Sequence, residues 1–117
     1  MVSNLTLREA RCNFTWCLAK LVVFAVSLGY EVAIDEGMDR ITAKDPTSDH
    51  MKNSLHNIGL AQDINLYKDG VWLSKTEDHG ILGLWWEDLG KSLGFPLRWG
   101  GRFKDGNHYS WEWEGRA

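Results

Sequence analysis

The chain opens with a long stretch in which apolar residues recur every three or four positions. Thr6 and Glu9 fit a capping box at its start, and Gly29 supplies a stop at its end. The periodicity predicts one long helix over residues 7–28 with a wide apolar face. Its apolar positions are Ala10, Phe14, Cys17, Leu18, Leu21, Ala25 and Leu28.

Beyond that helix the pattern shortens to strand-like segments. Residues 30–34 predict a short strand, and residues 59–67 alternate well enough for a longer one. The Lys68-Asp69-Gly70 sequence predicts a hairpin turn into residues 71–73. The tail "HYSWEWEG", residues 108–115, alternates like a final strand.

A second helical pattern covers roughly residues 80–93, and Gly94 and Pro96 end it. Residues 35–53 are polar, without periodicity, and predict a long loop. We therefore expect a single α+β domain over residues 1–117, with a small antiparallel sheet packed against a long N-terminal helix and a second helix. The apolar side of that second helix is predicted to carry Trp85, Trp86, Leu89 and Leu93.

The amino-acid composition excludes few classes of function. The 117 residues suit one domain, and 44% hydrophobic with 25% charged residues is ordinary for a globular protein. The net charge of −3 argues against a general nucleic-acid binder. The one basic cluster, Arg98, Arg102 and Lys104, is expected to be a solvated loop.

Two features of the first helix bear on compartment and membrane association. Cys12 and Cys17 are five residues apart, which suits neither a redox pair nor a disulfide framework, so we expect two buried free thiols. The apolar run around them resembles a signal sequence, but Lys20 interrupts it and no small-residue cleavage site follows. We interpret it as a core helix without stable membrane insertion, with an export role as the alternative.

The histidines suggest the chemistry. His56 and Asp63 are seven residues apart, and His108 follows Asp105 by three. A catalytic zinc ion needs three protein ligands and one position for water, which His56, Asp63 and His108 can provide. An odd separation puts two residues on opposite faces of one strand. We therefore expect His56 in the loop before the strand, with Gly59 allowing the chain to turn.

Two further residues complete the predicted chemistry. Zinc lowers the pKa of bound water from 15.7 to about 7. Asp105, close to His108 in sequence, is placed to accept and return the proton. Arg40, in the long loop, is the candidate for holding an oxyanion or a substrate carboxylate.

Two segments then resemble a known family. The segment "SLHNIGLAQD", residues 54–63, resembles the S-x-H-x-x-G-x-A-x-D motif of the LAS-type zinc peptidases, and "DGNH", residues 105–108, resembles their acid-x-x-His motif. That family includes D-alanyl-D-alanine carboxypeptidases, D-Ala-D-Ala dipeptidases of vancomycin resistance, and phage endolysins that cut L-alanyl-D-glutamate bonds. The segment "WGGRFKDGNHYS", residues 99–110, resembles the short phage and prophage members, and the resemblance covers most of residues 31–113.

The resemblance implies zinc on His56, Asp63 and His108, and an acid/base at Asp105, where several members have Glu. It also places the family's arginine at Arg40 and its motif serine at Ser54, which would position substrate or the first ligand. Tryptophans near the third ligand are candidates for lining a substrate groove, namely Trp99, Trp111 and Trp113. The other two histidines, His50 and His79, are expected to be solvent-exposed, with the alternative that either reaches the cleft.

We therefore expect a zinc-dependent peptidoglycan peptidase, an endolysin that cleaves L-alanyl-D-glutamate during host lysis by a bacteriophage. The alternatives are a D-Ala-D-Ala carboxypeptidase or dipeptidase, and a non-catalytic wall-binding or signalling module of the same fold. The expected partners are bacterial peptidoglycan stem peptides, without nucleic acid, and the expected state is a monomer. Such a protein would stay in the cytoplasm of the producing cell until lysis and act on the periplasmic cell wall. His and carboxylate ligands also accept divalent ions other than zinc.

Overall fold

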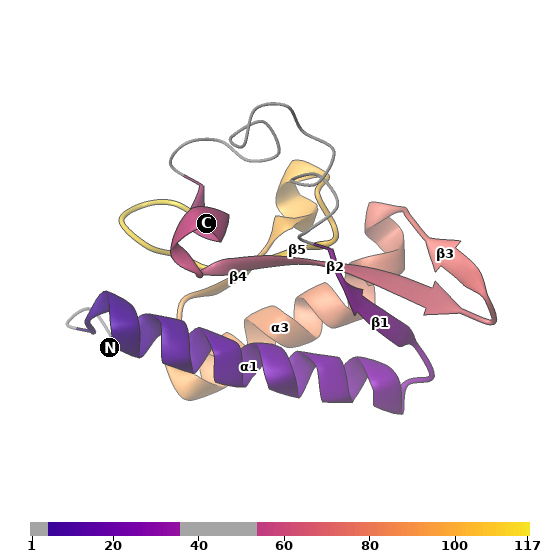
Figure 1. Cartoon of the computed structure of the whole chain (residues 1–117), viewed down its shortest axis with the longest axis horizontal. Helices are drawn as coiled ribbons and strands as arrows, with labels where there is room; N and C mark the ends of the chain where they lie inside the picture. The colour runs from indigo at the N-terminus through magenta and orange to yellow at the C-terminus, as the bar shows by residue number, and fades with distance from the viewer. Residues whose placement is uncertain (1–4, 36–53) are drawn as a thin grey trace.

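The computed structural model describes residues 5–35 and 54–117 and has two layers, a sheet and a pair of helices (Figure 1). Helices α1, Leu7–Ser27, and α3, Gly80–Leu93, both lie on one face of the sheet. The predicted α+β class is confirmed. The loop predicted over residues 35–53 falls almost entirely outside the described residues.

The sheet is antiparallel throughout and has the order β1-β2-β5-β4, with β3 paired to β2. Its longest strand, β2, pairs with β5, which comes from the far end of the chain. The strands are β1 Glu31–Ile34, β2 Ala61–Lys68, β3 Val71–Leu73, β4 Leu97–Trp99 and β5 His108–Trp111. The sequence pattern did not predict β4, because three residues are too few to show an alternation.

The long helix begins and ends as predicted from its local signals. The Thr6 backbone N–H donates to Glu9 Oε1 at 2.9 Å, and the Glu9 N–H donates to Thr6 Oγ1 at 3.1 Å, so the capping box is formed. Gly29 follows the helix at φ +94°, a conformation that favours glycine. The predicted hairpin is also confirmed: Asp69 and Gly70 have φ of 52° and 77°, as in a type I′ turn.

Helix α3 packs through a buried stripe that differs in part from the predicted one. Trp86 is fully buried, Trp85 and Leu89 are half-buried, and Leu93 is exposed, so the prediction for Leu93 is wrong. Two glycines take part in the stripe because bulkier residues would not fit. A Cβ at Gly83 would overlap the Trp99 ring, and one at Gly90 would lie 2.7 Å from the Phe95 carbonyl oxygen.

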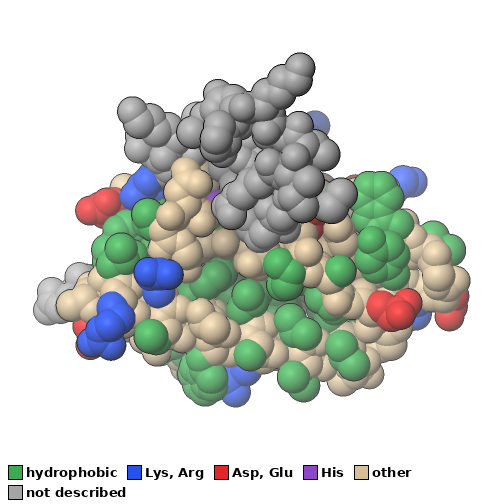
Figure 2. All heavy atoms as spheres, in the orientation of Figure 1, with side chains coloured by type: hydrophobic (Ala, Val, Ile, Leu, Met, Phe, Trp, Pro, Cys, Tyr) green, Lys and Arg blue, Asp and Glu red, His purple; other side chains and the backbone are tan. Residues whose placement is uncertain are grey.

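Helix α1 contributes one face to the core and leaves the other exposed. It buries Cys17 but exposes Cys12, which corrects the prediction of two buried thiols. By length and composition α1 is apolar enough to cross a membrane, a test that soluble core helices and signal sequences also pass. Hydrophobic side chains are visible over the helix layer in Figure 2. The exposed apolar residues of α1 include Trp16, Val23 and Val26.

The predicted basic cluster is partly paired rather than simply solvated. Arg98 Nε lies 2.9 Å from Glu112 Oε1, and Arg102 Nη2 lies 2.9 Å from Glu87 Oε1. The Glu87 carboxylate also accepts the Trp99 backbone N–H, at 3.1 Å. These contacts fix the segment that leads from β4 toward β5.

Candidate metal centre

The pairing of β2 with β5 brings Asp63 and His108 together. In the antiparallel register these two residues are direct partners, so their side chains leave the sheet on the same face. That face is the one opposite the helices, because Ile64 and Leu66, which alternate with Asp63 along β2, are fully buried in the core.

His56 reaches the same point from a short 3-10 helix, Leu55–Ile58, that precedes β2. Ser54 caps this helix, and its Oγ accepts the His56 backbone N–H at 3.2 Å. Gly59 ends it at φ +77°, and a Cβ there would lie 2.7 Å from Arg11 Nε. The predicted turn at Gly59 is therefore present, and Ser54 contacts the backbone of His56.

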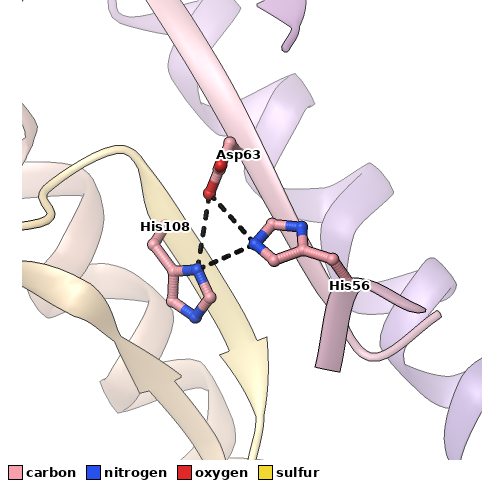
Figure 3. Close-up of side chains that lie close together, drawn as sticks. All are labelled: His56, Asp63 and His108. Atoms are coloured by element: carbon pink, nitrogen blue, oxygen red, sulfur yellow. Dashed lines mark hydrogen bonds and ion pairs between the residues drawn. The ribbon is translucent and has the colours of Figure 1, made fainter. Parts of the chain in front are cut away.

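Three donor atoms converge in front of the sheet (Figure 3). His56 Nε2 lies 3.2 Å from His108 Nδ1, and each of these nitrogens lies 3.4 Å from Asp63 Oδ1. A tetrahedral zinc ion with ligands at 2.0–2.1 Å requires ligand-to-ligand distances of about 3.3 Å. The spacing of the three atoms fits one face of such a tetrahedron, so these residues could hold a metal ion.

The electrostatics of the triad also suit a cation. Asp63 Oδ1, one of the three converging atoms, is buried without a hydrogen-bond partner among the described residues. Burial by itself raises the pKa of Asp63, but the close imidazoles of His108 and His56 outweigh it and hold the pKa at about 2. The carboxylate is therefore ionised across the physiological range and available as a ligand.

Asp105 stands beside the triad without belonging to it. Its Oδ2 lies 3.9 Å from His108 Nδ1, and its side chain is 57% exposed. Partial burial and the Asp63 carboxylate raise the pKa of Asp105, against the opposing effect of the two imidazoles. A carboxyl group that is accessible, close to the donors and more basic than usual suits proton transfer.

The backbone around Asp105 is tightly packed. The Asp105 N–H donates to the Gly100 carbonyl at 3.0 Å, and the Asp105 carbonyl accepts the His108 N–H at 3.1 Å. A Cβ at Gly100 would overlap the Asp105 carbonyl, and one at Gly106 would lie 2.5 Å from Thr76 Cα. The turn is thus held between a 3-10 helix, Gly100–Phe103, and a second one, Thr76–His79.

Other predicted site residues fall into three groups. Trp111 is buried and its ring lies tilted against that of Phe95, with ring centroids 5.0 Å apart, so its predicted place in a substrate groove is wrong. Trp99 and Trp113 also pack against the core, and Trp99 Nε1 donates to the Gly106 carbonyl at 2.7 Å. Arg40 and His50 lie outside the described residues.

His79 differs most from expectation. It is only 2% exposed, and its Nδ1 lies 2.7 Å from the Tyr109 hydroxyl, so the prediction of a solvent-exposed histidine is wrong. Burial lowers the pKa of His79 to about 4, against the weaker opposing effect of Asp78. Nothing in the local sequence identified this pair, because the partners are separated by α3 and β4.

A triad of two imidazoles and a carboxylate, with an accessible acid beside it, is the kind of site that metal-dependent hydrolases use. Comparison then identifies the family. Residues 47–111 match the family described as D-alanyl-D-alanine carboxypeptidase, which is more than half of the chain, so the protein belongs to this family of peptidases. No curated protein matches the chain.

A solved structure supports the same fold. The chain is similar to the L-Ala D-Glu endopeptidase ChiX of Serratia marcescens, with a TM-score of 0.57 and 19% sequence identity. The likeness covers 81% of this chain and 77% of ChiX. The α+β arrangement predicted from the sequence is thus the arrangement of a known peptidase.

Proposed function

We propose that this peptidase is zinc-dependent and hydrolyses a bond in the stem peptides of peptidoglycan, between L-alanine and D-glutamate. The observation that carries the proposal is the convergence of three donor atoms at 3.2–3.4 Å. The family membership supports the peptidase activity. The substrate named for ChiX supports the choice of bond.

His56, Asp63 and His108 would hold the ion. When bound, zinc supplies Lewis acidity, which polarises a carbonyl and lowers the pKa of a water molecule from 15.7 to about 7. The protein's own contribution is to hold the donors rigidly. Asp63 and His108 lie on paired strands, and His56 lies on a capped turn.

Asp105 would transfer the proton. It would accept a proton from the attacking water and deliver it to the amine of the departing residue, a role typically worth about 10²–10⁴ in rate. Its exposed carboxylate beside His108 supports this role. Arg40 is proposed from the sequence alone to hold a substrate carboxylate or the developing oxyanion.

A second candidate is a D-alanyl-D-alanine carboxypeptidase or dipeptidase, which the description of the matched family favours. The two activities release different products from the same substrate. Cleavage by a carboxypeptidase removes the terminal D-alanine, whereas cleavage by the endopeptidase separates the rest of the stem peptide from L-alanine.

A muropeptide digest analysed by mass spectrometry tests the proposal, alongside metal analysis of the purified protein. Release of peptides that begin with D-glutamate, by protein that contains one zinc ion per chain, is the expected result. Loss of D-alanine alone would replace the endopeptidase with the carboxypeptidase. An intact digest with zinc-loaded protein would overturn both.

We further propose an endolysin role, supported by the resemblance of residues 54–63 and 105–108 to short phage members. The protein would remain in the cytoplasm until the membrane is opened and then reach the cell wall. Expression in a bacterial host should leave the culture intact until the membrane is permeabilised, after which turbidity should fall. Lysis without permeabilisation would contradict this localisation.

A further inference from the structure

A small polar pocket opens beside Asp105. It has a volume of about 140 Å³ and is lined by residues of β2, β3, the Thr76–His79 helix and the Lys104–Asn107 turn. Asp105 belongs both to this pocket and to the surroundings of the metal triad. A group bound in the pocket would therefore lie next to the proposed proton donor.

The register of the sheet places part of the pocket lining on the same face as the triad. Asn65, which lines the pocket, follows Asp63 by two residues along β2 and so points to the same side. Trp72, also in the lining, pairs with Tyr67 of β2 and shares that side. The pocket therefore opens on the face of the triad through Asn65 and Trp72, whereas His79 lines it from the helix layer, where it contacts Tyr109.

His79 gives the pocket a buried polar wall. Its side chain is almost fully buried, and its Nδ1 is engaged by the Tyr109 hydroxyl at 2.7 Å. The ring is neutral at physiological pH because burial lowers its pKa to about 4. When Tyr109 donates to Nδ1, Nε2 carries the hydrogen and can donate to a ligand.

The remaining lining favours an anion. Lys104 supplies a cation, and Asn65 supplies amide N–H donors. Trp72 adds an apolar wall that is 58% exposed. Among the described residues of the lining, the acid is Asp105. Donors from three separate elements around a small volume suit a carboxylate more than a neutral or apolar group.

We propose that the pocket formed by Asn65, His79 and Lys104 binds the carboxylate of the residue whose amine is released. This inference rests on the proposed function. In an L-alanyl-D-glutamate bond the glutamate carbon that bears the reacting nitrogen also bears a free carboxylate. Binding of that carboxylate would hold the departing nitrogen beside Asp105. The protein would then discriminate between stem peptides with a free carboxylate and those in which it is amidated.

Two matched synthetic peptides test the specificity. Both contain the L-alanyl-D-glutamate bond, and they differ only in a carboxylate or a carboxamide at the glutamate α-carbon. We expect zinc-loaded parent protein to favour the carboxylate by about tenfold in kcat/KM, mainly through KM. Lys104→Met and Asn65→Leu should each bring the ratio of the two kcat/KM values toward one. Lys91→Met removes an equal charge from α3 and should leave the ratio unchanged.

A binding measurement separates the pocket from the catalytic proposal. Calorimetric titration of the released D-glutamyl product and of its carboxamide, on parent and Lys104→Met protein, needs no turnover. Preference for the carboxylate in the parent and its loss in Lys104→Met support the pocket, even if neither peptide is cleaved. Equal binding of both products would overturn the pocket, and active cleavage alongside it would leave the proposed function standing.

Discussion

The two faces of the β2–β5 pair differ in the kind of side chain that they bury. On the helix face, Ile64 and Tyr109 are fully buried, and the indole Nε1–H of the neighbouring Trp86 donates to the Arg98 carbonyl at 2.9 Å. On the other face lie side-chain atoms that are buried without a hydrogen-bond partner in the described part of the chain. They are Asp63 Oδ1, His108 Nε2 and Ser110 Oγ.

Within each of these two strands, the residues on one face therefore stabilise the fold, and those on the other face form the candidate site. Burial of apolar side chains on the helix face favours folding. Burial of unpartnered polar atoms on the other face opposes it. A cation between His56, Asp63 and His108 would remove part of that cost, because it would bind Asp63 Oδ1, which is buried without a hydrogen-bond partner among the described residues. The site face is thus the part of the protein that a ligand can stabilise.

The largest effect should follow from removal of a ligand charge. Asp63→Asn should lose bound zinc and lower peptidase activity by more than about 10⁴-fold, since both the ion and productive acid–base chemistry depend on the triad. Metal content and peptide hydrolysis measure these outcomes. Asp88→Asn, an exposed carboxylate on α3, is the matched control and should retain both. Unchanged zinc content in Asp63→Asn would refute the ligand assignment.

A smaller loss should follow at the neighbouring acid. Asp105→Asn should retain zinc and folding while activity falls by about 10²–10⁴-fold, because proton transfer alone is lost. Metal analysis and thermal unfolding should match those of the parent. Activity equal to that of the parent would remove Asp105 from the mechanism.

Substitutions on the helix face should lower the stability of the protein. Trp86→Ala should lower the free energy of unfolding by about 3–5 kcal/mol, because it leaves a cavity and removes a buried N–H donor. Urea titration measures this change. Trp72→Ala removes the same side chain from an exposed position and should change the free energy of unfolding by less than about 0.5 kcal/mol. Equal losses in both variants would contradict the contrast between the two faces.

Buried His79 should make the free energy of unfolding depend on pH, by about 3 kcal/mol at most. Its pKa falls from 6.5 in the unfolded chain to about 4 in the folded protein, so the unfolded state binds the proton more readily. The free energy of unfolding should therefore be highest above pH 6.5 and decrease as the pH falls to 4. His79→Gln should show a shallower decrease in urea titrations over that range. A parallel decrease in parent and variant would exclude His79 as its source.

The smallest effect distinguishes the two thiols. Exposed Cys12 should react rapidly with a thiol reagent, whereas burial raises the pKa of Cys17 to about 11 and should block it. Titration should give one reactive thiol per native chain and two in denaturant. Cys12→Ser should leave none in the native protein, and rapid labelling of that variant would place Cys17 on the surface.

Local sequence determined much of this protein. Thr6 and Glu9 start α1, Asp69 and Gly70 form the hairpin turn, and Gly59 turns the chain between His56 and Asp63. These features depend on backbone preferences and on contacts between residues a few positions apart. The sequence also predicted the three residues that could hold a metal ion, because two short motifs contain them.

Only the tertiary structure placed β4 beside β5, buried Trp111, and joined His79 to Tyr109. It also brought the pocket beside Asp105 together from four separate elements. These features arise from contacts between segments distant in sequence. Whether such a residue is buried, paired or exposed depends on which surface folds against it, and no local spacing specifies that surface.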